Sequence, residues 1–170
     1  VLFLQGGATA QFAAIPLNLT APGAVVDYVN TGTWSTKAIA EAKRYCQVNV
    51  VAEASAPEFN TVPAESGWQR SPAAAYLHYT PNETIHGVEF PFVPEARGIP
   101  LVADLSSTIL SRPIDVSRFG VIYAGAQKNI GPAGLVVVIV REDLLGKARP
   151  DTPTVFDWKA MAADGSMLNT

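Results

Sequence analysis

The sequence predicts an α/β protein built on a mostly parallel sheet, and three observations point to it. Short apolar segments with many β-branched residues recur along the chain. Several of them are apolar at every position, which is typical of strands covered on both faces. Segments with the composition of helices lie between some of them, which gives the alternation of strand and helix found in such sheets. The strands that we expect are residues 1–4, 48–52, 74–79, 101–105, 121–124 and 135–140.

Two helices are expected beside these strands. Residues 9–19 begin with helix-forming residues and meet Pro16, which cannot donate a helical hydrogen bond. Residues 35–45 offer the hydroxyl of Ser35 as a candidate N-cap, followed by good helix formers and by basic residues in the last turn. The segment 54–72 is rich in proline and polar residues, so we expect it to cross the surface as a connection.

Composition excludes several classes of function. The formal net charge is only -3 and no basic run is present, so neither nucleic acid nor a membrane surface is expected as a partner. The longest apolar run, residues 135–140, is far too short to span a bilayer. A single cysteine excludes an internal disulfide framework, and the two histidines stand at unrelated positions, so we expect no metal site. A cytoplasmic location is the plain expectation.

The length of 170 residues suits one domain with a sizeable core. The chain starts as if already inside a strand, without an initiator methionine or the pattern of a signal peptide, and it stops without a terminal element. Our hypothesis is therefore that it is part of a longer polypeptide.

Lys128 is the first candidate for chemistry. It follows an apolar strand and enters a turn of small residues, in the segment Tyr123-Ala-Gly-Ala-Gln-Lys-Asn-Ile-Gly-Pro-Ala-Gly134. A lysine at the mouth of a buried strand can lose hydration and, with a lowered pKa, attack an aldehyde. The alternative is a solvated lysine in an ordinary turn, which is the commoner situation.

The segment Gly6-Gly7-Ala8-Thr9 is a candidate phosphate cradle. It follows the first strand and opens a helical segment, where backbone N–H groups and the helix dipole favour an anion. The spacing fits neither a Walker loop nor a dinucleotide fingerprint, and a tight turn is the alternative interpretation.

Three further side chains stand at predicted strand ends or helix starts. Asp104 ends an apolar strand, where a buried carboxylate needs a partner such as a protonated heteroaromatic nitrogen. Alternatively, Asp104 caps the next turn by accepting hydrogen bonds from the amides of Ser106 or Ser107. Trp34 precedes the second helix and either stacks on a flat ring or anchors that helix in the core. Thr84 offers a hydroxyl to a ring oxygen or to a structural turn.

Taken together, these groups form one chemical set: an amine for an aldehyde, a phosphate cradle, a stacking ring, a carboxylate for a ring nitrogen and a hydroxyl for a ring oxygen. Pyridoxal phosphate needs all of them. Other sets are weaker, because no strand-Gly-x-Ser-x-Gly elbow surrounds Ser106 or Ser107 to make a triad with His78 and Asp115. For His86 we expect a structural role.

Across essentially the whole chain, the sequence resembles the phosphoserine aminotransferases. The most specific stretches are Gln11-Phe-Ala-Ala14, Pro16-Leu-Asn18, Tyr79-Thr-Pro-Asn-Glu-Thr-Ile-His-Gly87, Asp104-Leu-Ser-Ser-Thr-Ile-Leu-Ser-Arg-Pro-Ile-Asp115 and the segment around Lys128. The resemblance implies the large cofactor-binding domain of a fold-type I transferase over residues 1–170, with a seven-stranded, mostly parallel sheet, helices on both faces, and a homodimer.

The resemblance also implies roles for individual residues. Lys128 corresponds to the lysine that carries the cofactor aldehyde, Asp104 to the partner of the pyridine nitrogen, Trp34 to the stacking residue and Thr84 to the contact on the ring hydroxyl. The phosphate contacts correspond to Ala8, Thr9 and Gln127 and, in the other subunit, to Asn169 and Thr170. Many members have glycine followed by arginine or serine where this chain has Ala8-Thr9, so only the backbone donors carry over there.

The activity implied is transfer of the amino group of glutamate to 3-phosphohydroxypyruvate in serine biosynthesis, and in some bacterial members to a four-carbon analogue in pyridoxine biosynthesis. The family's N-terminal segment and C-terminal small domain, which supply the substrate-binding arginines, do not correspond to any part of this sequence. Two alternatives stay open: a truncated part that binds cofactor or dimerises without catalysis, and a lysine enzyme without cofactor, such as an aldolase.

Overall fold

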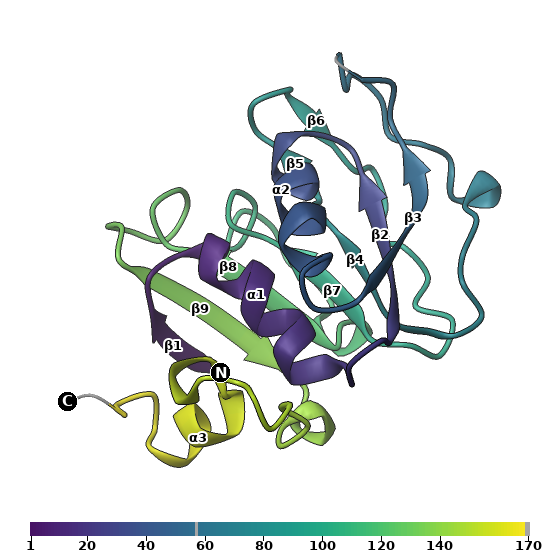
Figure 1. Cartoon of the computed structure of the whole chain (residues 1–170). Helices are drawn as coiled ribbons and strands as arrows, with labels where there is room; N and C mark the ends of the chain where they lie inside the picture. Colours follow the sequence, from purple (N-terminus) through teal and green to yellow (C-terminus); the bar gives the residue numbers. More distant parts are fainter. Residues whose placement is uncertain (57, 169–170) are drawn as a thin grey trace.

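The computed structural model describes residues 1–56 and 58–168, which form a seven-stranded sheet in the order β1-β9-β8-β7-β4-β2-β3. Figure 1 shows this sheet with helices packed on it. The strands are β1 (Leu2–Gln5), β2 (Val25–Asn30), β3 (Gln47–Glu53), β4 (Ala74–Tyr79), β7 (Leu101–Asp104), β8 (Val121–Gly125) and β9 (Leu135–Val140). A separate hairpin joins β5 (Asn82–Glu83) to β6 (Val88–Glu89).

The sheet is mostly parallel, as the sequence predicted. Only β9 runs against its neighbours, since it pairs antiparallel with both β8 and β1, whereas the remaining pairs are parallel. The carboxyl ends of the other strands therefore meet at one edge. Ligands gather at this edge in open α/β sheets.

Strand β2 is the element of the sheet that the sequence analysis missed. Asp27 divides its apolar residues, yet the strand is central and Asp27 is fully buried. The carboxylate accepts hydrogen bonds from Asn49 Nδ2 at 2.8 Å and from the Ser71 amide at 3.1 Å. Asn49 lies directly opposite Asp27 in the pairing of β2 with β3. The strand tolerates its carboxylate because neighbours that are distant in sequence satisfy it.

The expected helices both form, with shifted starts. Helix α1 (Ala8–Leu19) contains Pro16 in its last turn, and α2 (Thr33–Ala42) begins before the expected position and ends earlier. The prediction that Ser35 is the N-cap is wrong, because Gly32 is the N-cap and the Ser35 hydroxyl accepts a hydrogen bond from the Gly32 amide at 3.0 Å.

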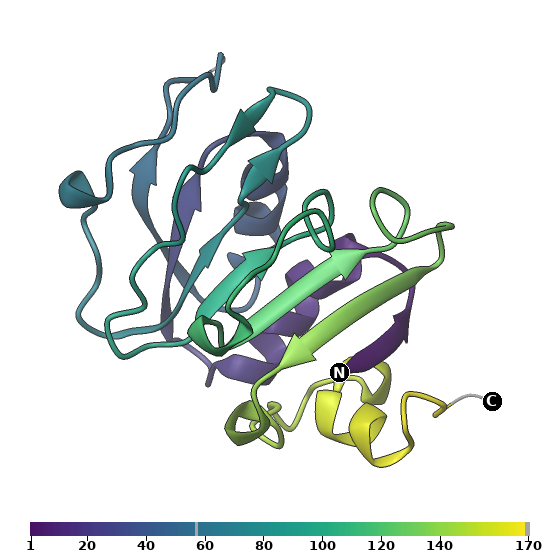
Figure 2. The same ribbon diagram turned by 180° about the vertical axis from the view of Figure 1, so that it is seen from behind.

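Two apolar clusters lie on opposite faces of the sheet. One contains the buried residues of α1, α2 and α3 (Trp158–Ala163), including the fully buried Trp158. The other is closed by side chains from loops, among them Trp68, Phe90 and Phe119. Figure 2 shows the sheet from this second side. Helices were expected on both faces, but in residues 1–56 and 58–168 the three α-helices contribute to one cluster only.

The segment expected to be a connection, residues 54–72, lies outside the strands in its described parts, 54–56 and 58–72, which contain a short 3₁₀ turn at Glu65–Gly67. Within the described part of the chain, no helix combines the length and the apolar character that crossing a membrane requires.

Candidate functional site

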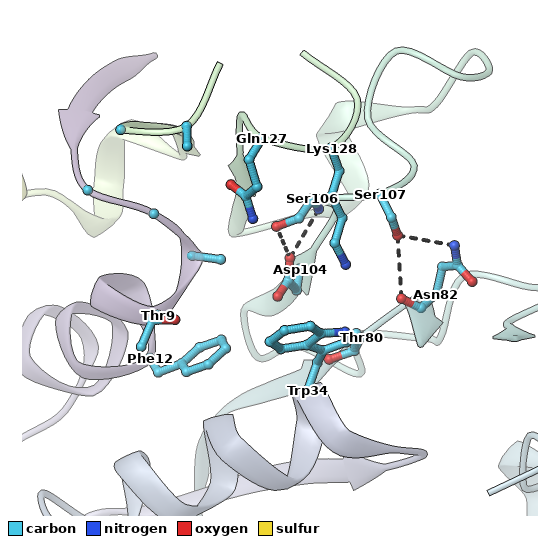
Figure 3. Close-up of a pocket in the computed structure, with 15 residues that line it drawn as sticks. Thr9, Phe12, Trp34, Thr80, Asn82, Asp104, Ser106, Ser107, Gln127 and Lys128 are labelled. Atoms are coloured by element: carbon cyan, nitrogen blue, oxygen red, sulfur yellow. Dashed lines mark hydrogen bonds between the residues drawn. The ribbon is translucent and has the colours of Figure 1, made fainter. Parts of the chain in front are cut away.

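A cavity of about 230 Å³ opens at the edge where the strand ends meet. Each wall comes from a different strand end: Gly6 and Gly7 follow β1, Thr80 follows β4, Asp104 ends β7 and Lys128 follows β8. Figure 3 shows Lys128 and Asp104 extending toward the same space above the indole of Trp34. Six of the candidate residues line this cavity together: Ala8, Thr9, Trp34, Asp104, Gln127 and Lys128.

The N-terminus of α1 forms one wall. Gly7 is its N-cap and provides no side-chain bond, the first turn contains no acidic residue, and Gly7, Ala8 and Thr9 line the cavity. Gly6 has a φ of +93°, a conformation that favours glycine, and its amide donates to the Gly134 carbonyl at 2.9 Å. Uncapped N–H groups at the start of a 12-residue helix are an anion-binding arrangement.

Gly125 at the end of β8 allows this wall to approach the lysine segment. A Cβ at position 125 would lie 2.7 Å from Gln127 Oε1 and 3.2 Å from the Ala8 amide nitrogen. The space beside Gly125 is therefore shared by the helix start and the Gln127 amide. A side chain there would push the two apart.

Lys128, Thr84 and Trp34 form a connected group. Lys128 Nζ donates to Thr84 Oγ1 at 2.6 Å, and Trp34 Nε1 donates to the same hydroxyl oxygen at 3.2 Å. The lysine nitrogen lies 4.8 Å from the centroid of the indole. Residues separated by more than ninety positions thus converge on one point, and Thr84 joins the lysine to the aromatic ring.

Asp104 is buried at the back of the cavity, with 6 % of its surface exposed. Its Oδ1 accepts hydrogen bonds from the Ser106 amide at 3.0 Å and the Ser106 hydroxyl at 2.6 Å. Burial raises the pKa of Asp104, while the bonds from Ser106 and the charge of Lys128 act in the opposite direction. The turn-capping interpretation is confirmed for Ser106, and the same carboxyl group also lines the cavity.

A histidine lies behind this carboxylate on the sheet. His78 Nε2 is 2.8 Å from the hydroxyl of Tyr123, and the imidazole stacks on Tyr28 with 4.5 Å between ring centroids. Burial lowers the pKa of His78 to about 3, so the ring is neutral at physiological pH. Its hydrogen bond is to Tyr123 and not to a serine, which agrees with the rejection of a catalytic triad.

Sequence reasoning missed several residues of the cavity. Thr80 Oγ1 is buried without a hydrogen-bond partner in the described chain, and Asn82 Nδ2 donates to Ser107 Oγ at 3.1 Å. Both Thr80 and Asn82 lie in the stretch of residues 79–87, whose resemblance to the phosphoserine aminotransferases was the feature of the sequence that could have indicated them. Phe12 of α1 also lines the cavity.

The remaining candidates lie elsewhere. His86 Nε2 is 3.0 Å from Thr33 Oγ1 at the start of α2, in line with the structural role expected for it. Asn169 and Thr170 lie outside the described residues. In residues 1–56 and 58–168, no group of histidine, cysteine, aspartate and glutamate could hold a metal ion.

Comparison with known proteins agrees with this geometry. Curated phosphoserine aminotransferases from Pseudomonas entomophila and Azotobacter vinelandii are each 63% identical over all 170 residues, which make up 47% of their own length. The chain thus spans about half the length of the curated relatives it matches.

Solved structures of the same name have the same fold. Phosphoserine aminotransferase from Bacillus circulans subsp. alkalophilus superposes with a TM-score of 0.95 at 46% identity, covering 99% of this chain and 47% of that one. The phosphoserine aminotransferase from Trichomonas vaginalis, described as bound to pyridoxal phosphate, gives 0.90 at 44% identity, covering 99% of this chain and 48% of that one. The family model for class-V aminotransferases matches residues 1–159, and the chain belongs to the class-V aminotransferase family.

Proposed function

We propose that this chain is the cofactor-binding part of a phosphoserine aminotransferase and that it holds pyridoxal phosphate in the cavity of Lys128. The observation that carries the proposal is the convergence of Lys128 Nζ, Thr84 Oγ1 and the Trp34 ring. A reactive amine, a hydroxyl and a flat aromatic surface within a few ångströms suit an aromatic aldehyde that carries a ring hydroxyl.

The groups present fit this cofactor. Its phosphate suits the start of α1, where amides of the first turn lack side-chain caps and no carboxylate competes. Gln127 lies beside this wall, and its amide can donate to the same phosphate. The hydroxyl of Thr80, buried and unpartnered in the chain as described, adds a polar group that an occupant of the cavity can satisfy.

The ring of the cofactor would rest on Trp34, with its hydroxyl toward Thr84 and its nitrogen toward Asp104. A buried carboxylate facing a ring nitrogen favours the protonated form of that nitrogen. The cost of burying Asp104, which raises the pKa of this carboxyl group, is then offset by an opposite charge.

When bound, pyridoxal phosphate supplies the aldehyde that carries the amino group and the electron sink that makes the substrate α-carbon acidic. Lys128 Nζ would hold the aldehyde in the resting state. Once displaced by a substrate amine, the same nitrogen would remove the proton from the α-carbon of glutamate. Thr84 would orient this amine, because it is the hydrogen-bond acceptor of Lys128 Nζ.

We infer that the amino-group donor is glutamate and that the acceptor is 3-phosphohydroxypyruvate, in serine biosynthesis, with the four-carbon substrate of pyridoxine biosynthesis as a further acceptor. The named relatives support the first part of this inference. We also propose a cytoplasmic homodimer in which residues 1–170 are the large domain. The exposed position of Lys128 and Gln127 at the cavity mouth leaves room for a second subunit.

The test is cofactor capture. Pyridoxal phosphate is added to the 170-residue chain, the visible absorbance is recorded, and the adduct is reduced with borohydride and mapped by peptide mass. We expect the label on Lys128 and its loss in Lys128→Arg, whereas Lys147→Arg, which changes an exposed lysine away from the cavity, keeps it. Label on another lysine, or none, would contradict the proposal.

Glutamate then distinguishes an enzyme from a binding module. If glutamate converts the bound cofactor to its amine form, the chain performs a half-reaction by itself. If the label forms on Lys128 but glutamate changes nothing, the chain is the truncated, non-catalytic alternative. A chain that condenses a keto substrate on Lys128 without cofactor would instead be a lysine enzyme of the aldolase type.

A further inference from the structure

Glu83 is a fully buried carboxylate, and the hydrogen bonds to its oxygens come from the start of α2. Its Oε2 accepts from the Trp34 amide at 2.9 Å, and its Oε1 accepts from the Ser35 amide and the Ser35 hydroxyl, each at 2.7 Å. No cation pairs with it in residues 1–56 and 58–168. The amides of the first turn of α2 and the positive end of the helix dipole compensate its charge.

Most helix caps come from the residue just before the helix. Here the cap comes from 48 residues farther along the chain, because Gly32 at the N-cap has no side chain. A Cβ on Gly32 would lie 2.6 Å from Glu83 Cδ. The extended φ of Gly32 is open to any residue, so the space occupied by the carboxylate is what requires glycine here.

Glu83 directly precedes Thr84, which accepts hydrogen bonds from Lys128 Nζ and Trp34 Nε1. The carboxylate of Glu83 accepts a hydrogen bond from the backbone amide of Trp34, and Thr84 is the next residue along the chain. The position of Glu83 therefore affects both residues. The turn is closed further by the His86 and Gly87 amides, which donate to the Glu83 carbonyl at 3.2 and 2.9 Å. One side chain thus ties together the two segments that face Lys128.

We propose that Glu83 is a positioning residue, which acts through Trp34 to fix the indole plane beneath the cofactor ring and to keep Thr84 in reach of Lys128. This rests on the proposed function, since the ring that Trp34 receives is that of pyridoxal phosphate. Glu83 itself does not line the cavity. If Glu83 were only a structural cap of α2, replacing it would change the affinity for the cofactor by the same factor whether Trp34 is present or absent.

The test is a double-mutant cycle on the dissociation constant of pyridoxal phosphate, measured by titration of the 170-residue chain. The variants are Glu83→Gln, Trp34→Ala and the pair. We expect Glu83→Gln to weaken binding by about 10-fold in the presence of Trp34 and by less than about 2-fold in its absence. The control is Glu89→Gln, on the same hairpin but exposed and paired with Arg112, which should leave affinity unchanged.

Equal losses in the two backgrounds would overturn the assignment of Glu83 while leaving the proposed function intact. If Glu83→Gln does not fold, Gly32→Ala takes its place in the cycle, because the new methyl group must displace the same carboxylate. A wild-type chain that captures no cofactor on Lys128 refutes the proposed function first, and this inference with it.

Discussion

His78 gives the sharpest test of the buried network behind the cavity. Its ring is fully buried between Tyr28 and Tyr123, and burial lowers the pKa of the imidazole to about 3. The ordinary pKa of histidine is 6.5. Between these two values the unfolded chain binds a proton at this ring and the folded chain does not. The free energy of unfolding therefore falls as the pH is lowered through this range.

The size of the effect follows from the shift. At pH 7 the ring is neutral in the folded chain and mostly neutral in the unfolded chain, whereas at pH 5 protonation of the unfolded chain lowers the free energy of unfolding by about 2 kcal/mol. The loss approaches about 5 kcal/mol at still lower pH. Because domains of this size are stable by only about 5–15 kcal/mol, the change at pH 5 is easily measured.

The assay is urea unfolding followed by tryptophan fluorescence at pH 7 and pH 5, with wild type compared to His78→Gln. We expect the decrease in the free energy of unfolding to be about 2 kcal/mol smaller in the variant. His86→Gln is the matched control for the loss of one imidazole outside this buried network. Because burial raises the pKa of Asp104, this residue increases the free energy of unfolding as the pH falls. Asp104 is present in all three chains, so its contribution cancels in the comparison. Equal decreases in wild type and His78→Gln would refute the argument.

Three further predictions test the fold and the cavity. Gly125→Ala places a methyl group 3.2 Å from the Ala8 amide, so we expect the dissociation constant of pyridoxal phosphate to rise about 10-fold or more, and an unchanged titration would contradict the shared wall. Trp158→Ala should lower the free energy of unfolding by about 3–5 kcal/mol in urea, because the indole is fully buried; a loss below 1 kcal/mol would argue against that burial. Asp104→Asn should retain cofactor but slow its conversion by glutamate about 100-fold or more in single-turnover absorbance, and an unchanged rate would remove Asp104 from the chemistry.

Much of the sheet could be predicted because most of its strands are rich in apolar and β-branched residues, and β9 is apolar at every position. Strand β2 could not, since Asp27 breaks its apolar run and the groups that satisfy this carboxylate, Asn49 and Ser71, belong to other segments. The same reason explains the error at Ser35. A hydroxyl near a helix start is normally the best local cap, but a carboxylate from a distant hairpin occupies that place.

The candidate site was predicted from residue type and from position at strand ends, and these two signals located Lys128 and Asp104. Side chains without a distinctive chemical type were missed. Thr80 and Asn82 are ordinary polar residues in sequence, and their place in the cavity depends on where β4 ends. For His78 the sequence analysis considered only a catalytic triad, which it rejected. The contact with Tyr123 could not be predicted, because the two residues are 45 positions apart in the sequence.

The antiparallel strand β9 has a consequence for the position of Lys128. Because β8 and β9 are neighbours, the connection that carries the lysine leaves and re-enters the sheet at adjacent positions, and the Ala126 amide donates to the Leu135 carbonyl at 2.9 Å. The Ile130 and Gly131 amides close the turn on the Ala126 carbonyl. The amine of Lys128 is therefore carried at the cavity by a short, internally bonded loop. In the proposed reaction, the attack of Lys128 Nζ that recovers the resting state would be intramolecular, at an effective concentration far above that of any free amine in solution.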